Sequence, residues 1–187
     1  IGLASADGGK ITDITGSGYF NISPSFTYDG NAILFMSNRY GMRTHASWGS
    51  QDDVFICFLN QAAYDRYRLS KEDIELQKQA SKKTKKSRNV NVELEGLSDR
   101  IVRLTPNSSD ISGAILSKDG ENLYYTSRFE GGYDLWKMNL RKRETKLISK
   151  GAGSGRFAAD STGKTIFLLG RSLKKLEGDK LSSIAFS

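Results

Sequence analysis

Apolar and polar positions along this chain form short runs that recur in one order. Residues 23–39, 112–128 and 154–171 each contain a strand-like run, an Asp-Gly or Thr-Gly pair, a hydrophobic run and then an arginine. Glycine after a short polar residue favours a tight turn between antiparallel strands, because it adopts positive φ at little cost. The pattern therefore predicts three hairpins of the same design.

Two further strand-like runs follow each hairpin. The third runs lie at 53–59, 133–138 and 172–176, and the fourth runs lie at 100–104, 145–148 and 181–184. Four antiparallel strands per repeat form the blade of a β-propeller. The sequence therefore predicts an all-β fold, a partial β-propeller of four-stranded antiparallel blades.

The turn glycines are unevenly spaced. Gly120 and Gly163 lie 43 residues apart, which is a normal blade length, whereas Gly30 and Gly120 lie 90 residues apart. We interpret the excess as a short helical insertion at about 61–89, between the third and fourth strands of one blade. It should contain helices at 61–69 and 71–80, the second starting at Ser70 as N-cap with Asp73 three residues later.

We predict one incomplete propeller domain over residues 1–187. Its parts are a remnant blade at 1–16, a blade with the insertion at 17–106, and blades at 107–150 and 151–187. Propellers usually close with four to eight blades. We therefore expect the remaining blades to belong to a larger parent protein, or a second copy of the chain to pair with this one.

Composition narrows the classes of function. The chain has a net charge of +7, and a basic run at 82–88 contributes much of it. That run has no interleaved aromatic residues, so we interpret it as a solvated linker and expect no nucleic-acid partner. The sequence has no run of 18 apolar residues, so it predicts no membrane-spanning helix. Cys57 is the only cysteine and should be a small buried hydrophobe.

The sequence contains no recognisable catalytic constellation. His45 is the only histidine, and the Gly-x-Ser-x-Gly motif of a serine hydrolase does not occur. One histidine and one cysteine do not supply a zinc site. We therefore predict no catalytic residue, no metal ligand and no cofactor in this chain.

The segment at 38–52 is long for a link between neighbouring strands. It contains five residues that we predict to bind peptide: Arg39, Tyr40, Arg43, His45 and Trp48. Long loops on a rigid scaffold often carry binding, and arginine with aromatic residues suits peptide carboxylates and side chains. The alternative is that Tyr40 and Trp48 pack over the edge of the blade.

Arginines close the second strand of each repeat, and aspartates open the next strand in two of them. We predict structural pairs at these strand ends, formed by Arg39 with Asp53 and by Arg128 with Asp134. The alternative is a ring of positive charge near the propeller mouth, which would attract peptide C-termini.

The repeat also resembles a known family. The pattern of residues 23–30 and 37–41 resembles the propeller repeat of the periplasmic protein TolB and of tricorn-type proteases. The segment at 92–105, with Leu-Glu-Gly-Leu-Ser-Asp-Arg at its centre, resembles the tricorn-like group more narrowly. The third repeat departs from the pattern, because Thr162 replaces aspartate before the turn glycine.

This resemblance implies a serine peptidase that degrades oligopeptides, with propellers that filter or channel them. The catalytic residues would lie in a downstream protease domain, beyond residue 187, and the location would be periplasmic. The expected partners are peptides or unfolded polypeptide, the other parts of the parent protein and possible homo-oligomeric copies. Two alternatives remain open: a TolB-like protein-binding scaffold without enzymatic activity, and the propeller cap of a prolyl-oligopeptidase-type enzyme.

Overall fold

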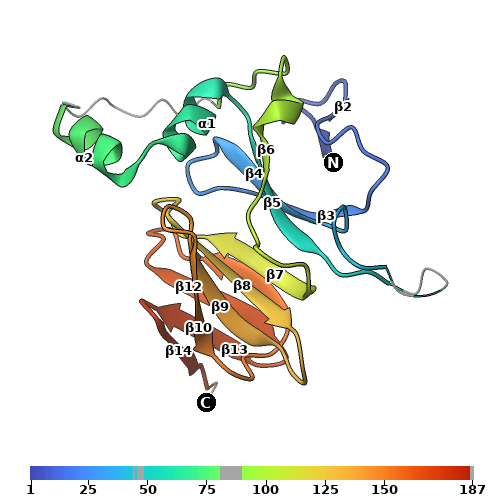
Figure 1. Cartoon of the computed structure of the whole chain (residues 1–187), viewed down its shortest axis with the longest axis vertical. Helices are drawn as coiled ribbons and strands as arrows, with labels where there is room; N and C mark the ends of the chain where they lie inside the picture. The colour runs from blue at the N-terminus through green and yellow to red at the C-terminus, as the bar shows by residue number, and fades with distance from the viewer. Residues whose placement is uncertain (44, 46–48, 81–89, 186–187) are drawn as a thin grey trace.

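Strands dominate the computed structural model, which describes residues 1–43, 45, 49–80 and 90–185 (Figure 1). The strands are β1 (Gly2–Leu3), β2 (Thr12–Asp13), β3 (Asn21–Phe26), β4 (Ala32–Ser37), β5 (Asp53–Phe58), β6 (Ile101–Arg103), β7 (Asp110–Leu116), β8 (Asn122–Arg128), β9 (Asp134–Asn139), β10 (Glu144–Ser149), β11 (Gly155–Ala159), β12 (Thr165–Gly170), β13 (Leu173–Glu177) and β14 (Lys180–Ser183). The helices are α1 (Gln61–Arg68), α2 (Lys71–Ala80) and the 3-10 helix η2 (Leu97–Arg100).

Within the described residues, these strands form three four-stranded antiparallel sheets and one two-stranded sheet. The first sheet has the order β3-β4-β5-β6, the second β7-β8-β9-β10 and the third β11-β12-β13-β14, and β1 pairs with β2. Neighbouring strands in each sheet are consecutive in the chain. The predicted repeat of hairpin, third strand and fourth strand is therefore present three times.

The two central strands of the first sheet are buried along their whole length, and this explains their continuous hydrophobic sequence. Side chains alternate between the two faces of a strand. In β5, Val54 and Ile56 point into the core shared with the second sheet, whereas Phe55 and Cys57 point to the opposite face. Cys57 is fully buried, as predicted, and desolvation raises the pKa of its thiol to about 11.

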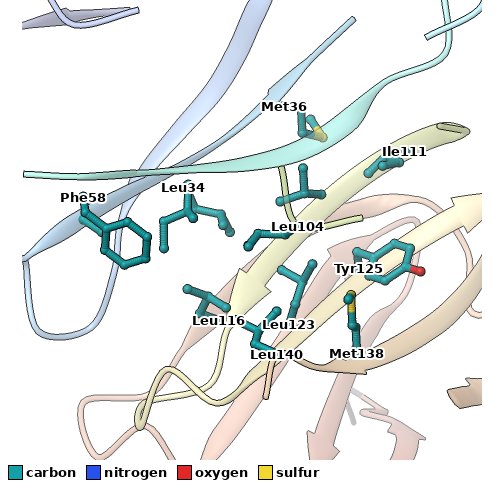
Figure 2. Close-up of a cluster of buried hydrophobic side chains, with 13 residues drawn as sticks. Leu34, Met36, Phe58, Leu104, Ile111, Leu116, Leu123, Tyr125, Met138 and Leu140 are labelled. Carbon is teal, nitrogen blue, oxygen red and sulfur yellow. The ribbon is translucent and has the colours of Figure 1, made fainter. Parts of the chain in front are cut away.

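The largest core lies between the first and second sheets (Figure 2). Its buried members are Ala32, Leu34, Met36, Val54, Ile56, Phe58, Leu104, Ile111, Leu116, Leu123, Tyr125, Met138 and Leu140. They come from β4, β5, β7, β8 and β9 and from the ends of neighbouring loops. At about 25 cal/mol per Å² of buried apolar surface, such a cluster is the main attraction between the two sheets.

The second and third sheets share another core and also make a close backbone contact. Tyr124 and Leu135 of the second sheet pack against Ile166 and Leu168 of the third. On the first strands of these sheets, a Cβ added at Gly113 would overlap the carbonyl oxygen of Gly155. A glycine is therefore required where β7 approaches β11.

The three hairpin turns use the same chemistry although the third has a different sequence. In the first, the Thr27 hydroxyl donates to Asp29 over 2.8 Å, and Ser117 and Asp119 make the equivalent bond in the second. In the third, the two residue types exchange places: the Thr162 hydroxyl donates to Asp160 over 2.7 Å. This exchange preserves the bond, and the hydrogen bond from Thr162 lowers the pKa of Asp160.

The insertion follows β5 and precedes β6, as predicted. Asn60 caps α1 by accepting a hydrogen bond from the Ala63 amide over 2.9 Å. Ser70 caps α2: its hydroxyl oxygen accepts the Asp73 amide over 3.1 Å, and its hydroxyl donates to the Asp73 carboxylate. Both predicted helices are therefore confirmed. Residues 81–89 lie outside the described part of the chain.

The close approach of β7 and β11 gives a testable consequence. We expect Gly113→Ala to lower the free energy of unfolding by about 1 to 3 kcal/mol, because the methyl group has no space between the two sheets. Gly132→Ala is the matched control, since its Cβ would meet no atom within 4 Å. Urea denaturation should show a change below about 1 kcal/mol for the control. Equal effects of the two substitutions would contradict the close packing.

Candidate functional site

The connection between β4 and β5 emerges at the end of the first sheet that lies opposite its Asp-Gly turn. Its two arms are tied together, because Arg43 and Ser50 form an isolated β-bridge and the Gln51 amide donates to the Met42 carbonyl over 3.0 Å. A Cβ at position 41 would overlap the Gln51 carbonyl, so Gly41 allows the arms to approach. The loop base is therefore held by backbone contacts.

Arginine and tyrosine side chains stack on one another beside this loop. We name the set of Tyr19, Arg39, Tyr40, Arg43 and Arg103 the arginine–tyrosine surface. The Arg39 guanidinium lies 5.9 Å from the centre of the Tyr19 ring and 5.6 Å from that of Tyr40. Arg43 lies 6.0 Å from the Tyr19 ring and Arg103 lies 5.3 Å from the Tyr40 ring. These are cation–π distances.

Tyr40 connects this surface to the core. Its ring stacks on Phe55 at 5.9 Å between centroids, and Phe55 stacks on Phe35 at 5.6 Å. Tyr40 nevertheless remains 56% exposed. The residue therefore packs over the blade on one side and offers an aromatic ring to solvent on the other.

The charges of the surface differ in how they are compensated. Arg103 pairs with the buried Asp53, at 2.8 Å between nitrogen and oxygen. Arg39 and Arg43 are both exposed, and neither forms an ion pair with any other residue that the structure describes. Each of these two guanidinium groups stacks on tyrosine through its flat face. The N–H groups at its edge can therefore donate hydrogen bonds to a ligand.

The contacts of this surface do not include His45. His45 is exposed and makes no hydrogen bond or ion pair within the described part of the chain. Trp48 lies outside the described residues. Sequence reasoning also missed Tyr19 and Arg103, which are far from the loop in sequence. In the sequence, Tyr19 is marked only as an aromatic residue before the first strand of the blade, and Arg103 only as an arginine at the end of the fourth strand.

The predicted strand-end pairs are replaced by other contacts. Asp53 pairs with Arg103 of the neighbouring strand, and Arg39 stacks on tyrosines instead. Arg128 pairs with Asp110, which lies opposite it in the β7–β8 register. Asp134 accepts the Gly151 amide over 2.8 Å. Arg128 thus pairs with the carboxylate opposite it, Arg39 pairs with no carboxylate among the described residues, and neither pairs with the aspartate that opens the next strand.

Asp53 is the most heavily bonded carboxylate near this surface. Its side chain is fully buried and accepts hydrogen bonds of 2.8 Å from Arg103, Thr105 and Ser108. Thr105 in turn accepts the Val54 amide over 3.1 Å. A buried charged group has to be hydrogen-bonded and paired, because its burial otherwise costs free energy. The network fixes Arg103, and through it the position of the Tyr40 ring.

Asp52 lies next to this network at the junction of the first and second sheets. Its backbone pairs with Ser109, with hydrogen bonds of 2.8 and 3.0 Å in the two directions. Desolvation, followed by the charges of Asp110 and Asp53, raises the pKa of the Asp52 carboxyl to about 6. The ionised form of Asp52 is therefore disfavoured in the folded chain.

No group of three or more histidine, cysteine, aspartate or glutamate side chains among the described residues is placed to hold a metal ion. No described helix combines the length and apolar character needed to cross a membrane.

No protein-family model matches the chain, and no curated protein matches it. Several solved structures match it in fold. Tricorn protease aligns with a TM-score of 0.66 and 12% identity, over 98% of this chain and 19% of that chain. TolB from Acinetobacter baumannii aligns with a TM-score of 0.58 and 14% identity, over 99% of this chain and 37% of that chain. A puromycin hydrolase aligns with a TM-score of 0.53 and 11% identity, over 94% of this chain and 23% of that chain.

These comparisons establish the class of fold. The chain is a partial β-propeller of four-stranded antiparallel sheets, with the fold of the propellers found in tricorn protease and TolB. It spans about a fifth of the tricorn protease chain and over a third of the TolB chain. Because the identities are low, the likeness concerns the fold, and the function has to be argued from the site.

The buried network around Asp53 predicts an asymmetry between two arginines. Arg103→Ala removes the cation that faces a fully buried carboxylate, so we expect a loss of about 2 to 4 kcal/mol in the free energy of unfolding. Arg128→Ala is the control, since both members of the Arg128–Asp110 pair are about half exposed. Its loss should stay below about 1 kcal/mol in the same urea titration. A larger loss for Arg128→Ala would contradict this assignment.

The raised pKa of Asp52 predicts a pH-dependent stability. A carboxyl whose pKa is higher in the folded state stabilises the fold only while it is protonated, so this contribution is lost as the pH rises from about 4 through 6. With solvent screening, we expect Asp52→Asn to raise the free energy of unfolding by about 1 kcal/mol at pH 7.5. At pH 4 the gain should disappear. A gain that is equal at both pH values in denaturation experiments would refute the role of the charge.

Proposed function

We propose that this chain is a non-catalytic propeller segment that binds polypeptide at the arginine–tyrosine surface. It would filter or channel oligopeptides for a serine protease domain carried outside this chain. The resemblance of residues 92–105 to tricorn-like proteases supports the protease setting. The same resemblance supports a periplasmic location.

One observation carries the binding proposal. Arg39 and Arg43 are exposed, lie on tyrosine rings and have no carboxylate partner in the described part of the chain. Arg103 and Arg128, in contrast, each pair with a carboxylate. Guanidinium groups held against rings bind carboxylates and peptide carbonyls with little further loss of side-chain entropy.

The aromatic part of the surface suits the rest of a peptide. Tyr19 is 39% exposed and Tyr40 is 56% exposed, and Phe20 and Met42 beside them are more exposed still. Exposed tyrosine, phenylalanine and methionine next to arginine are the residue types enriched in protein interfaces. A peptide with apolar and acidic side chains would therefore find both kinds of contact here.

The proposal predicts a loss of binding in two variants. Arg39→Ala and Arg43→Ala should each weaken the binding of a fluorescein-labelled unstructured acidic peptide by about five- to tenfold, because each removes a charge-assisted contact. Fluorescence anisotropy at 50 and 300 mM salt measures this, and the affinity should fall at the higher salt.

The control for these variants is Arg156→Gln, which removes an exposed arginine from β11 of the third sheet. It should leave the affinity within about twofold. Peptide affinity that is the same in all three variants would contradict the proposed site. Binding of folded proteins but of no peptide would favour the TolB-like scaffold instead.

A further inference from the structure

A second candidate site, which is concave, lies at the strand ends opposite the arginine–tyrosine surface. It lies between the first and second sheets and under helix α1. It is a cavity of about 390 Å³ with one side open to solvent. The Asp-Gly turns of both sheets, the first turns of the insertion and the β9–β10 turn line it. The arginine–tyrosine surface belongs to the opposite strand ends, so the two sites are separate.

Helix α1 is fixed at both of its ends, and the cavity wall is therefore preformed. At the start, Asn60 caps the helix and its amide donates to Asn31 over 3.3 Å. At the end, Arg141 of the second sheet donates to the carbonyl oxygens of Tyr67 and Leu69. Helix α1 thus follows the last central strand of the first sheet and is hydrogen-bonded at its end to the second sheet.

The floor of the cavity is apolar. It is formed by Ala32, Ile56, Phe58, Leu116 and Leu140, all of which belong to the core between the two sheets. Figure 2 shows Phe58 on one side of this core and Leu116 and Leu140 on the other. A floor of this kind accepts an aromatic or large aliphatic side chain.

The rim carries three cationic side chains, which differ in their partners. Arg141 is neutralised by Glu121, at 2.9 Å. The Lys118 ammonium donates to the Thr162 carbonyl over 2.7 Å and lies 4.6 Å from the centre of the Tyr28 ring. Both of these partners among the described residues are neutral. The Arg66 side chain is exposed, and its guanidinium makes no hydrogen bond or ion pair with the other described residues.

The two remaining carboxylates of the rim are engaged by their own turns. Asp29 accepts the Thr27 hydroxyl and the Asn31 amide, and Asp119 accepts the Ser117 hydroxyl and the Glu121 amide. They hold the turns in shape. A negative ligand group is therefore favoured on the α1 side of the rim, where Arg66 stands.

We propose that this cavity binds a polypeptide segment in which an aromatic or large aliphatic side chain is followed by an acidic residue. The apolar side chain occupies the floor and the acidic side chain pairs with Arg66. This goes beyond the function proposed above, because it adds a second site at the other strand ends with its own sequence preference. A volume of about 390 Å³ accommodates one large side chain and part of its neighbour.

The test uses three labelled peptides that are blocked at both termini, so that only a side chain can carry negative charge. One contains a central Phe-Glu pair in a Gly/Ser background, the second has Phe-Gln and the third has Ala-Glu. Fluorescence anisotropy with the whole chain should give the Phe-Glu peptide an affinity about tenfold above each of the others.

In a chain that carries Arg39→Ala and Arg43→Ala, and so lacks the unpaired charges of the arginine–tyrosine surface, Arg66→Gln should abolish the preference for Phe-Glu over Phe-Gln. The matched control is Arg68→Gln, which removes an equal charge from the same helix turn, where Arg68 stacks on Tyr64 outside the cavity. It should keep the preference. Ala62→Trp places a large ring at an exposed position of the cavity wall and should block all three peptides.

Equal affinities for Phe-Glu and Phe-Gln, no binding of Phe-Glu, or equal losses in the Arg66 and Arg68 variants would each overturn this proposal. Its failure is distinguishable from that of the proposed function. If binding of the Phe-Glu peptide is lost in Arg39→Ala and Arg43→Ala but is kept in Arg66→Gln, the cavity site is overturned. The arginine–tyrosine surface would then remain supported.

Discussion

The burial of β4 and β5 between two hydrophobic cores is the constraint on which the rest of this structure depends. Each strand alternates its side chains into the core with the second sheet and into the core with the N-terminal segment and η2. If a strand that is buried on both faces shifted by one residue in register, each apolar side chain would point into the opposite core. The ends of the sheet are therefore fixed in space, and so are the described residues that directly flank them.

The two candidate sites use this rigidity in different ways. At one end, Arg103 and the stacked rings of Phe55 and Tyr40 connect the core to an exposed, positively charged surface. At the other end, Arg141 ties the insertion helix to the neighbouring sheet and leaves a cavity above the core. Both sites present arginines without carboxylate partners in the described residues, which suits acidic polypeptide in each case.

The sequence predicted the local structure well because turns and strand periodicity are local properties. It identified the hairpins, the place of the insertion and the Ser70 cap, but not the pairing of Asp53, whose partner lies 50 residues away in the chain. Thr162 appeared to break the repeat, although exchange with Asp160 preserves the bond. No sequence motif marks Tyr19 or Arg66. Only the three-dimensional packing shows that Tyr19 stacks on arginines and that the Arg66 side chain has no partner among the described residues.

The most direct test of a rigid scaffold with a peptide-binding end is amide chemical-shift mapping of the whole chain during titration with an unstructured acidic peptide. We expect chemical-shift changes at the amides of Tyr19, Arg39, Tyr40, Gly41 and Arg43. Amides in the core strands β5 and β8 should stay unchanged. Shifts spread over those core strands, or absent from the segment at 39–43, would contradict this expectation.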